Sequence, residues 1–333
     1  GFTKEGWTPL TPLDNFTEWV KCDFDSAITP DEASLLLYFP PYTYYAFLGP
    51  EPNATAVDYL VTDRKGYSFV TECLARNFKK DRVKLNSVVT AVHTAEDCVC
   101  AAVNGSSRYC GRYGIMTFSI GTLHAAVNKA ENSVCFKPPL PTWKQDAIRN
   151  ATPVFYGKVH LLFNSSFWNV TKEDQQVLGY VSNERGYYAS YIIDKLTPNV
   201  ITVDVAENLA VRVSNQSEKE TIGEVMTILR KMFGPEIPDP YRAVVSKWST
   251  DPLFSCSYTA YRTGVPENVF DLLLKPVNGS LYFAGESMNS SDYGYTHSGY
   301  GSGAYVAHQI AHLLSPSHFE PAHWSVEQAS FSW

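Results

Sequence analysis

Two neighbouring blocks near the end of the chain constrain the fold more than any other part of it. Leu281–Glu286 reads as a buried strand that ends in Gly-Glu, and Tyr293–Gly303 reads as a loop followed by a glycine-spaced helix start. Gly285 allows a close approach of the backbone, and the positive end of the following helix, Gly301–Leu314, favours partial negative charge. The arrangement suits a flat, charged cofactor, although the spacing alone also fits an ordinary, tightly packed strand, turn and helix.

Further motifs follow one another in a fixed order, and together with this block they resemble the flavin-dependent amine oxidases, especially the polyamine oxidases. The block at 281–303 resembles the C-terminal FAD signature of that family. The other matching segments are Asp63–Tyr67, Leu85–Val89, Phe136–Lys144 with Ala147-Ile148, Tyr156–Lys158, Phe167-Trp168, Trp248–Pro252 and Ser257-Tyr258. Each motif alone is weak, but their common order over roughly residues 20–315 is a strong signal.

The resemblance implies an α/β chain with an α+β substrate domain, forming the C-terminal portion of the FAD-linked amine oxidase fold. Cofactor and substrate domains interleave in that fold, so we expect a substrate-side segment 1–60, an FAD-domain segment 61–145, a substrate domain with a mixed sheet 146–270, a C-terminal FAD-binding segment 271–315 and a tail 316–333. The implied cofactor is FAD. The residues implied to contact it are Val88, Gly285, Glu286, Tyr295 and Thr296.

The dinucleotide fingerprint of the family has no counterpart in this sequence. No G-x-G-x-x-G follows a strand near Gly1, although this motif holds the dinucleotide pyrophosphate. By the family pattern the chain starts beyond the dinucleotide-binding unit, without Met or a signal peptide. We therefore expect one piece of a cleaved flavoenzyme, or a truncation, and a second polypeptide that carries the fingerprint as its partner.

Composition narrows the class of protein. With 333 residues, 44% of them hydrophobic and 18% charged, the chain can bury a substantial core. No run of apolar residues is long enough to span a membrane. The net charge of −7 argues against nucleic-acid binding and is compatible with a cationic substrate.

Glycosylation sequons indicate the compartment. The N-x-[ST] pattern occurs at Asn15, Asn53, Asn104, Asn150, Asn164, Asn169, Asn215, Asn278 and Asn289. Chance would give about two or three such sites at ordinary Ser and Thr usage. The excess predicts a secreted eukaryotic glycoprotein that carries these sites on its surface.

The seven cysteines fit the same compartment. They are Cys22, Cys73, Cys98, Cys100, Cys110, Cys135 and Cys256. A hairpin turning at Asn104-Gly105 would bring Cys100 and Cys110 nearly opposite each other, which makes them a candidate disulfide. An odd number leaves one thiol free or bridged to the expected partner chain. Metal binding is not expected, because no C-x-x-C pattern or His cluster occurs.

Periodicity predicts several elements directly. We expect helices over Leu13–Val20 and residues 67–78, and a clear amphipathic helix over Gln216–Phe233 with a Ser217/Glu220 capping box and a stop at Gly234. The expected strands are Val83–Val92, Val99–Val103, Tyr109–Phe118, Val154–Phe163 and Val200–Val205.

The resemblance also implies the catalytic residues. The family uses a buried Lys, bonded through a water to flavin N5, and Lys158 stands at the matching place inside an apolar strand. An unpaired buried ammonium is costly, and a lysine reaching solvent from an edge strand would be the ordinary alternative. Tyr295 and Tyr261 match rings that flank the amine, Tyr156 matches a ring two residues before the lysine, and Tyr187 or Tyr188 resembles a further pocket segment.

Departures from the family pattern leave the substrate open. Ile28, close to Asp25, stands where a carboxylate holds the distal amine of a polyamine, and Cys256 replaces a usual Gly, an exchange that could serve a disulfide. We expect a secreted enzyme that oxidises a polyamine or related amine with O2 to an imine or aldehyde and H2O2. The alternatives are an L-amino-acid oxidase, for which no arginine partner of a substrate carboxylate is evident, and a non-catalytic secreted glycoprotein.

Overall fold

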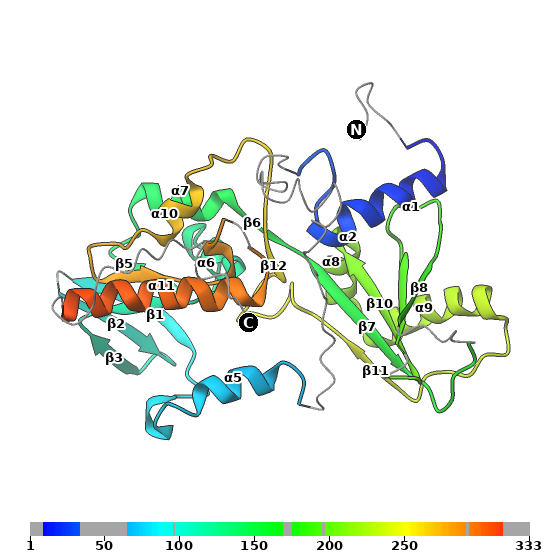
Figure 1. Ribbon diagram of the computed structural model, residues 1–333, viewed down its shortest axis with the longest axis horizontal. Coiled ribbons are helices and arrows are strands. Elements are labelled where there is room, and N and C mark those ends of the chain that lie inside the picture. The colour runs from blue at the N-terminus through cyan, green and yellow to red at the C-terminus, as the bar shows by residue number, and fades with distance from the viewer. Residues whose placement is uncertain are drawn as a thin grey trace, which may run out of the picture.

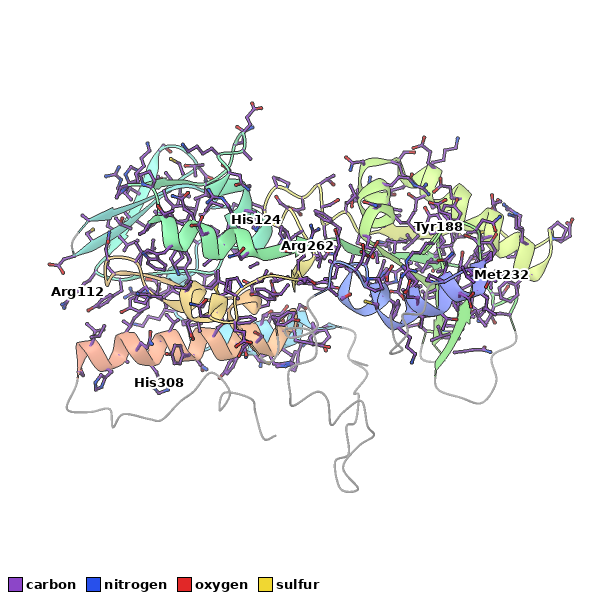
Figure 2. All side chains as sticks on the ribbon, turned by 90° about the horizontal axis from the view of Figure 1, so that it is seen from above. Arg112, His124, Tyr188, Met232, Arg262 and His308 are labelled. Atoms are coloured by element: carbon purple, nitrogen blue, oxygen red, sulfur yellow. A yellow bond between two sulfur atoms is a disulfide. The ribbon has the colours of Figure 1, made fainter. Side chains whose placement is uncertain are left out.

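The computed structural model describes residues 9–33, 65–95, 97–168, 175–194, 197–290 and 293–315. Its two larger sheets lie in two lobes, which are joined through a short strand pair near the middle of the molecule, and a second strand pair belongs to the first lobe (Figure 1). Side chains fill the interior of both lobes; His124 lies in one, Tyr188 and Met232 lie in the other, and Arg262 lies near the junction (Figure 2). In the described part of the chain, no helix is both long and apolar enough to cross a membrane.

The first lobe is built on a four-stranded sheet in the order β3-β2-β1-β5. Its strands are β1 (Val89–Ala95), β2 (Cys98–Val103), β3 (Ser107–Gly111) and β5 (Cys135–Lys137). Beside it, β4 (Gly114–Met116) pairs in parallel with β13 (Leu281–Phe283). The helices of this lobe are α6 (Ile120–Val127), α7 (Thr142–Asn150), α10 (Val269–Leu274) and α11 (Thr296–Leu314), with the 3-10 turn η2 (Glu286–Met288). Helix α5 (Ser68–Ala75), which buries no residue, and the 3-10 turn η1 (Lys80–Arg82) precede β1 in the chain.

A buried lysine ties two helices of this lobe together. Lys144, on α7, is fully buried, and its Nζ donates to the carbonyl oxygens of Leu272 (2.8 Å) and Leu273 (2.6 Å) at the end of α10. Carbonyls in the last turn of a helix lack a partner within that helix, so the lysine satisfies them. Burial, assisted by the positive charge of Lys275, lowers the pKa of Lys144 to about 7.

The second lobe is built on a five-stranded antiparallel sheet in the order β11-β7-β10-β9-β8. Its strands are β7 (Tyr156–Leu162), β8 (Gln175–Gly179), β9 (Ser190–Asp194), β10 (Val200–Ala206) and β11 (Arg242–Val245). Helices α8 (Glu207–Asn215) and α9 (Glu218–Phe233) pack on one face, and α1 (Pro12–Lys21) and α2 (Asp23–Ser26) lie beside the end of the sheet. The core under α8 and α9 includes Val159, Leu161, Val203, Val225 and Leu229.

The strand pair between the lobes consists of β6 (Ala151–Val154) and β12 (Tyr258–Tyr261), which run antiparallel. Strand β6 continues almost directly into β7, so the junction and the second sheet share one stretch of chain. This continuity places the first residues of β7 next to β12.

Several predicted elements are confirmed. Helix α1 covers Leu13–Val20, β10 covers Val200–Val205, and α9 has both hydrogen bonds of the Ser217/Glu220 capping box and ends at Gly234. Helix α11 begins at Thr296, five residues earlier than expected, because the glycines and serines of its first turns permit close packing against η2. Ser298 and Ser302 donate to the carbonyl oxygens of Glu286 and Gly285.

Two predicted strands are wrong in part. Strand β1 starts only at Val89, because Asn104 bonds the preceding backbone in place of a strand partner: its side chain accepts from Val88 N (3.0 Å) and donates to Asn86 O (3.0 Å). The expected strand Tyr109–Phe118 divides between two sheets, since the chain leaves β2 after Gly111 and pairs with β13 from Gly114 onward.

The sequons differ in accessibility. Asn104, Asn164, Asn215 and Asn278 are exposed, Asn15 and Asn150 are half-buried, and Asn53 and Asn169 lie outside the described residues. Asn289 is only 4% exposed, so the expectation of a surface glycan is wrong for this residue in the folded chain.

The hairpin places Cys100 directly opposite Cys110, as expected, and the structure joins their sulfur atoms in a disulfide. Cys256 is a free, buried thiol, so the alternative that it serves a disulfide is not realised in this structure.

We expect Lys144→Met to remove a pH dependence of stability. Because the pKa of Lys144 falls from 10.5 to about 7 on folding, the unfolded chain binds more protons between these values, and this residue makes stability rise with pH across the interval. The variant should also lose about 1–3 kcal/mol through two unsatisfied carbonyls. Thermal unfolding from pH 7 to 9 measures both effects. The exposed Lys84→Met serves as the control, and a wild-type advantage that fails to grow with pH would contradict the prediction.

Candidate active site

The pairing of β7 with β10 sets Lys158 opposite Asp204. The ammonium Nζ of Lys158 donates to Asp204 Oδ1 at 2.7 Å; the carboxylate is fully buried, whereas the lysine side chain is 45% exposed. Ser190 Oγ lies 3.3 Å from the second carboxylate oxygen. A buried anion thus holds a lysine that faces outward.

Two expectations for Lys158 are wrong in this structure. Its side chain is not buried, and its strand β7 is not an edge strand. Strand β7 lies between β11 and β10, and its side chains alternate between the two faces of the sheet. Val159 and Leu161 point into the core beneath the helices, while Lys158 lies on the other face, which is covered at Asp204 but leaves the lysine side chain 45% exposed. The apolar neighbours that suggested burial belong to the opposite face.

Two serines fix the backbone that carries this lysine. Ser246 Oγ accepts from the amide of Lys158 (2.6 Å) and donates to its carbonyl (3.1 Å). Ser257 Oγ does the same for Tyr156, at 2.8 Å and 2.6 Å. A Cβ on Gly157 would lie 2.9 Å from Ser246 Oγ, so glycine is needed between the two fixed residues.

Aromatic rings line the start of β7. The ring of Tyr156 lies 6.1 Å from Phe24 and 6.2 Å from Tyr258, and Lys158 Nζ lies 5.7 Å from the centre of the Tyr156 ring. A cation near the face of such a ring is attracted to it. The structure thus brings Tyr156 and Lys158 together, as the sequence predicts.

The Gly285–Glu286 turn lies on the other side of Tyr258. Gly285 has φ +150°, a backbone conformation that glycine adopts readily and other residues rarely adopt. Apart from its two chain neighbours, no atom of the described residues lies within 4 Å of where its Cβ would be. Glu286 is largely buried, which raises its pKa; its carboxylate accepts from Thr259 Oγ1 (3.0 Å) and from the amide of Gly294 (2.8 Å). The ring of Tyr258 lies 3.4 Å from the Cβ position of Gly294, which links this turn to Tyr156.

The remaining predicted site residues lie in different environments. Tyr261 is buried between Phe270 and Tyr293, and its hydroxyl donates to Ser287 O at 2.7 Å. Tyr295 is 58% exposed and stacks on His297. Thr296 is the exposed first residue of α11, and Val88 is exposed just before β1. The structure gives Tyr261 a packing contact and Tyr295 an accessible face.

A buried acidic cluster borders the same strand ends. Arg185 forms a two-pronged pair with Asp23 (2.8 and 2.6 Å) and a further pair with Glu18 (2.5 Å). Glu207, whose amide donates to Phe155 O, is hydrogen-bonded to Asp23. Burial and the charge of Asp23 raise the pKa of Glu207 to about 8, and its Oε1 is buried without a hydrogen-bond partner among the described residues.

Sequence reasoning missed Asp204, Thr259 and the acidic cluster. An acidic residue inside the apolar run Val200–Ala206 was a usable signal, since a buried carboxylate requires a partner. Ile28, at the position where the family has a carboxylate, is buried in an apolar cluster with Trp19.

The comparisons with known proteins identify the family of this chain. The family model "Flavin containing amine oxidoreductase" matches residues 21–311. Polyamine oxidase 1 of Zea mays is 32% identical over 89% of this chain and 59% of its own length, and polyamine oxidase 7 of Oryza sativa subsp. japonica is 30% identical over 90% and 62%. The chain therefore belongs to the flavin-containing amine oxidoreductase family, whose cofactor is FAD.

Solved structures show the same fold. Cyclohexylamine oxidase from Brevibacterium oxydans IH-35A superposes with a TM-score of 0.64 at 21% identity, covering 91% of this chain and 64% of its own. A putrescine oxidase redesigned in its cofactor binding gives 0.60 at 18% identity, with coverages of 74% and 53%. The chain spans about 60% of the length of the two plant relatives.

We expect Lys158→Met and Asp204→Asn to have unequal costs. Removing the lysine leaves a buried carboxylate unpaired, which costs about 3 kcal/mol. Removing the carboxylate frees a lysine that can turn to solvent, which costs about 1 kcal/mol or less. Urea unfolding of both variants and of the double variant measures the coupling. The double variant should be more stable than Lys158→Met; equal costs for the two single variants would contradict this account.

We expect Glu207→Gln to change the pH dependence of stability in the opposite sense to Lys144→Met. The folded pKa of about 8 lies above the usual 4.5, so the folded chain binds more protons in this interval, and the stability that Glu207 provides is lost as pH rises through 8. Glutamine can still donate to Asp23 but does not titrate. The melting temperature of the variant should exceed that of the wild type increasingly from pH 5 to pH 8.5, because the charged groups that act on residue 207, namely Asp23, Arg185 and the nearby Glu32, are the same in both proteins. Parallel profiles would show that Glu207 is ionised in the fold.

Proposed function

We propose that this chain forms the substrate side and part of the FAD site of a secreted amine oxidase. It oxidises a polyamine or related amine with O2, giving an imine or aldehyde and H2O2. The observation that carries the proposal is the half-exposed Lys158, held by Asp204 beside Tyr156 and linked through Tyr258 to the Gly285–Glu286 turn. Membership of the flavin-containing amine oxidoreductase family supports it.

The residues at the turn fit a flavin. Among the described residues, the space beside Gly285 is open and no side chain caps the start of α11, so the first amides of this helix can face partial negative charge. Gly285, Glu286, Tyr295 and Thr296 would hold the cofactor, and FAD would accept the hydride from the substrate carbon.

The chain's own groups position the amine and its proton. An amine must lose its proton before hydride transfer, and Lys158, kept in place by Asp204 and by Ser246, can hold a water at the reacting side. The Tyr156 ring offers a face to a cationic or neutral amine. Glu18 and Asp23 together carry one more negative charge than Arg185 balances, which favours a second ammonium group nearby, while Glu207 is kept largely protonated by its raised pKa.

A further polypeptide segment with the G-x-G-x-x-G fingerprint would complete the FAD site, either as a separate chain or as another part of the same protein. The lack of that motif in this sequence and the greater length of the relatives support this proposal. The exposed sequons and the Cys100–Cys110 disulfide support a secretory location.

The test uses the complete flavoprotein and its Lys158→Met/Asp204→Asn double variant, which avoids an orphaned buried charge. Anaerobic mixing with spermine or spermidine should bleach the flavin absorbance of the wild type. The double variant should bind FAD and reduce it about 10²–10⁴-fold more slowly, the usual contribution of a positioned proton-transfer group. Stopped-flow absorbance separates reduction from reoxidation by O2.

Lys219→Met, an exposed change on α9, is the matched control and should retain wild-type rates. Wild-type rates in the double variant would overturn the role of Lys158. Bleaching by L-amino acids but not by amines would favour the amino-acid oxidase. Such an enzyme needs an arginine to bind the substrate carboxylate, and Arg185 already pairs with Asp23 and Glu18. Purified complete protein without flavin would favour a non-catalytic glycoprotein.

A further inference from the structure

One face of the four-stranded sheet in the first lobe carries an unusual group of cysteines. Residues directly opposite in paired strands lie on the same face, so the register His93–Cys100–Cys110 places these three side chains in one row across β1, β2 and β3. Cys98 lies on the same face, two residues before Cys100. The other face is buried and holds Val92, Val99 and Phe136, so the cysteine face is the one turned away from the core.

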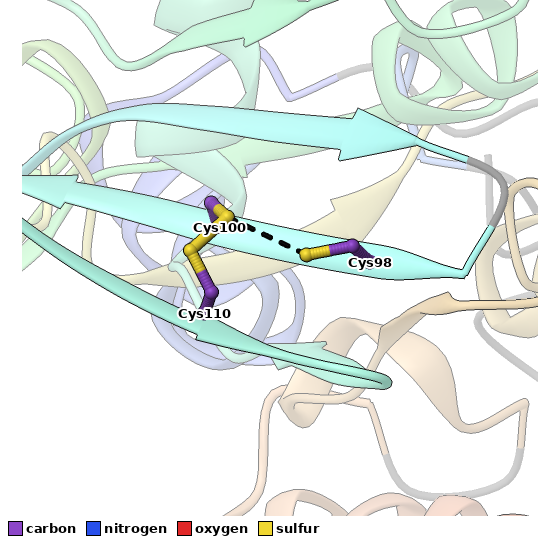
Figure 3. Close-up of side chains that lie close together, drawn as sticks. All are labelled: Cys98, Cys100 and Cys110. Carbon is purple, nitrogen blue, oxygen red and sulfur yellow. Dashed lines mark hydrogen bonds between the residues drawn. A yellow bond between two sulfur atoms is a disulfide. The ribbon is translucent and has the colours of Figure 1, made fainter.

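The free thiol of Cys98 touches the disulfide. Its Sγ lies 3.6 Å from Cys100 Sγ, and all three sulfur atoms lie within 4.8 Å of one another (Figure 3). Cys98 pairs across to Ala95, whose small side chain leaves the thiol uncrowded on that side. Cys110 is exposed, on a strand β3 that forms the edge of its sheet and is exposed at every residue.

We propose that Cys98, Cys100 and Cys110 form a thiol–disulfide exchange site. The Cys98 thiol loses its proton to solvent, and the thiolate attacks Cys100 Sγ. A Cys98–Cys100 bond forms as the Cys100–Cys110 bond breaks, and the electron pair leaves on Cys110, which takes a proton from water. No oxidant or reductant is consumed, and the result is a free thiol on the exposed edge strand.

The product requires a local change of the backbone. In an extended strand, same-face residues two positions apart are separated by about 6.6 Å at Cα and by a similar distance at Cβ, beyond the Cβ separation of about 3.5–4.5 Å that a disulfide needs. Cys98 is the first residue of β2, so moving this one strand end out of the extended conformation can bring the two Cβ atoms into range, and the cross-strand form seen in the structure is favoured. Exchange requires a thiolate next to a disulfide sulfur, and the contact between Cys98 and Cys100 supplies that arrangement.

Three close sulfurs could also suggest a soft metal ion, but two of them already share a covalent bond in this structure. Metal binding would need prior reduction of that bond, whereas exchange needs only the groups present. The observations favour exchange.

The experiment traps the free thiols of the folded, complete protein with iodoacetamide at pH 8, followed by acid quenching and peptic digestion without reductant. Mass spectrometry then identifies which cysteine is alkylated and which two are bridged. We expect molecules with alkylated Cys110 and a Cys98–Cys100 bridge, and we expect this species to disappear in Cys98→Ser.

Cys135→Ser is the matched control, because Cys135 is an exposed free thiol on the same sheet that has no contact with the bridge among the described residues. This variant should retain the alkylated Cys110 species. Alkylation of Cys98 alone, with Cys100–Cys110 bridged in every wild-type molecule, would overturn the proposal. So would Cys110 labelling that is equal in wild type and Cys98→Ser, or a thiol released at Cys100 instead of Cys110.

Discussion

The buried carboxylate of Asp204 is the constraint around which the second lobe is organised. It lies on a central strand of an apolar sheet and is fully buried, so the fold must provide a cation at that point. Lys158 meets the requirement from the neighbouring strand, and its direction away from the helix-covered face follows from the alternation of β7. The serines that bind the backbone of β7 then fix the lysine along the strand. Three contacts therefore fix the position of the Lys158 ammonium: its ion pair with Asp204 and the hydrogen bonds that Ser246 and Ser257 make to the backbone of β7.

The same strand pairing extends to the acidic cluster. Ala206 lies opposite Tyr156 at the end of the ladder, and the next residue, Glu207, starts α8 with its amide bound to Phe155. Its left-handed backbone, φ +53°, is unusual for a residue with a side chain and is held by that hydrogen bond and by the contact with Asp23. Arg185 completes the group and attaches α1 and α2 to the loop before β9. The same set of charges therefore anchors the first helices to the second lobe.

The sequence was most informative where a local rule decides the outcome. The capping box at Ser217 and the opposition of Cys100 and Cys110 both follow from short-range chemistry, and the structure has both of them. The order of the motifs indicated the family and the fold. The burial of Lys158 was mispredicted because a run of apolar neighbours does not reveal which face of a strand is covered. The role of Tyr261 as a packed core residue and the pairing of Asp204 required tertiary register, which no window of sequence contains.

Gly294 connects the Gly285–Glu286 turn to the aromatic residues beside Lys158. It has φ +85°, its amide holds the Glu286 carboxylate, and its Cβ position lies 3.4 Å from the Tyr258 ring, which in turn packs against Tyr156 two residues from Lys158. A side chain at residue 294 would meet the Tyr258 ring at an ordinary contact distance, but it would strain the turn, because this backbone conformation favours glycine. A residue other than glycine at this point would therefore have to be accommodated by a different loop conformation, and the hydrogen bond that holds the Glu286 carboxylate would be disturbed with it.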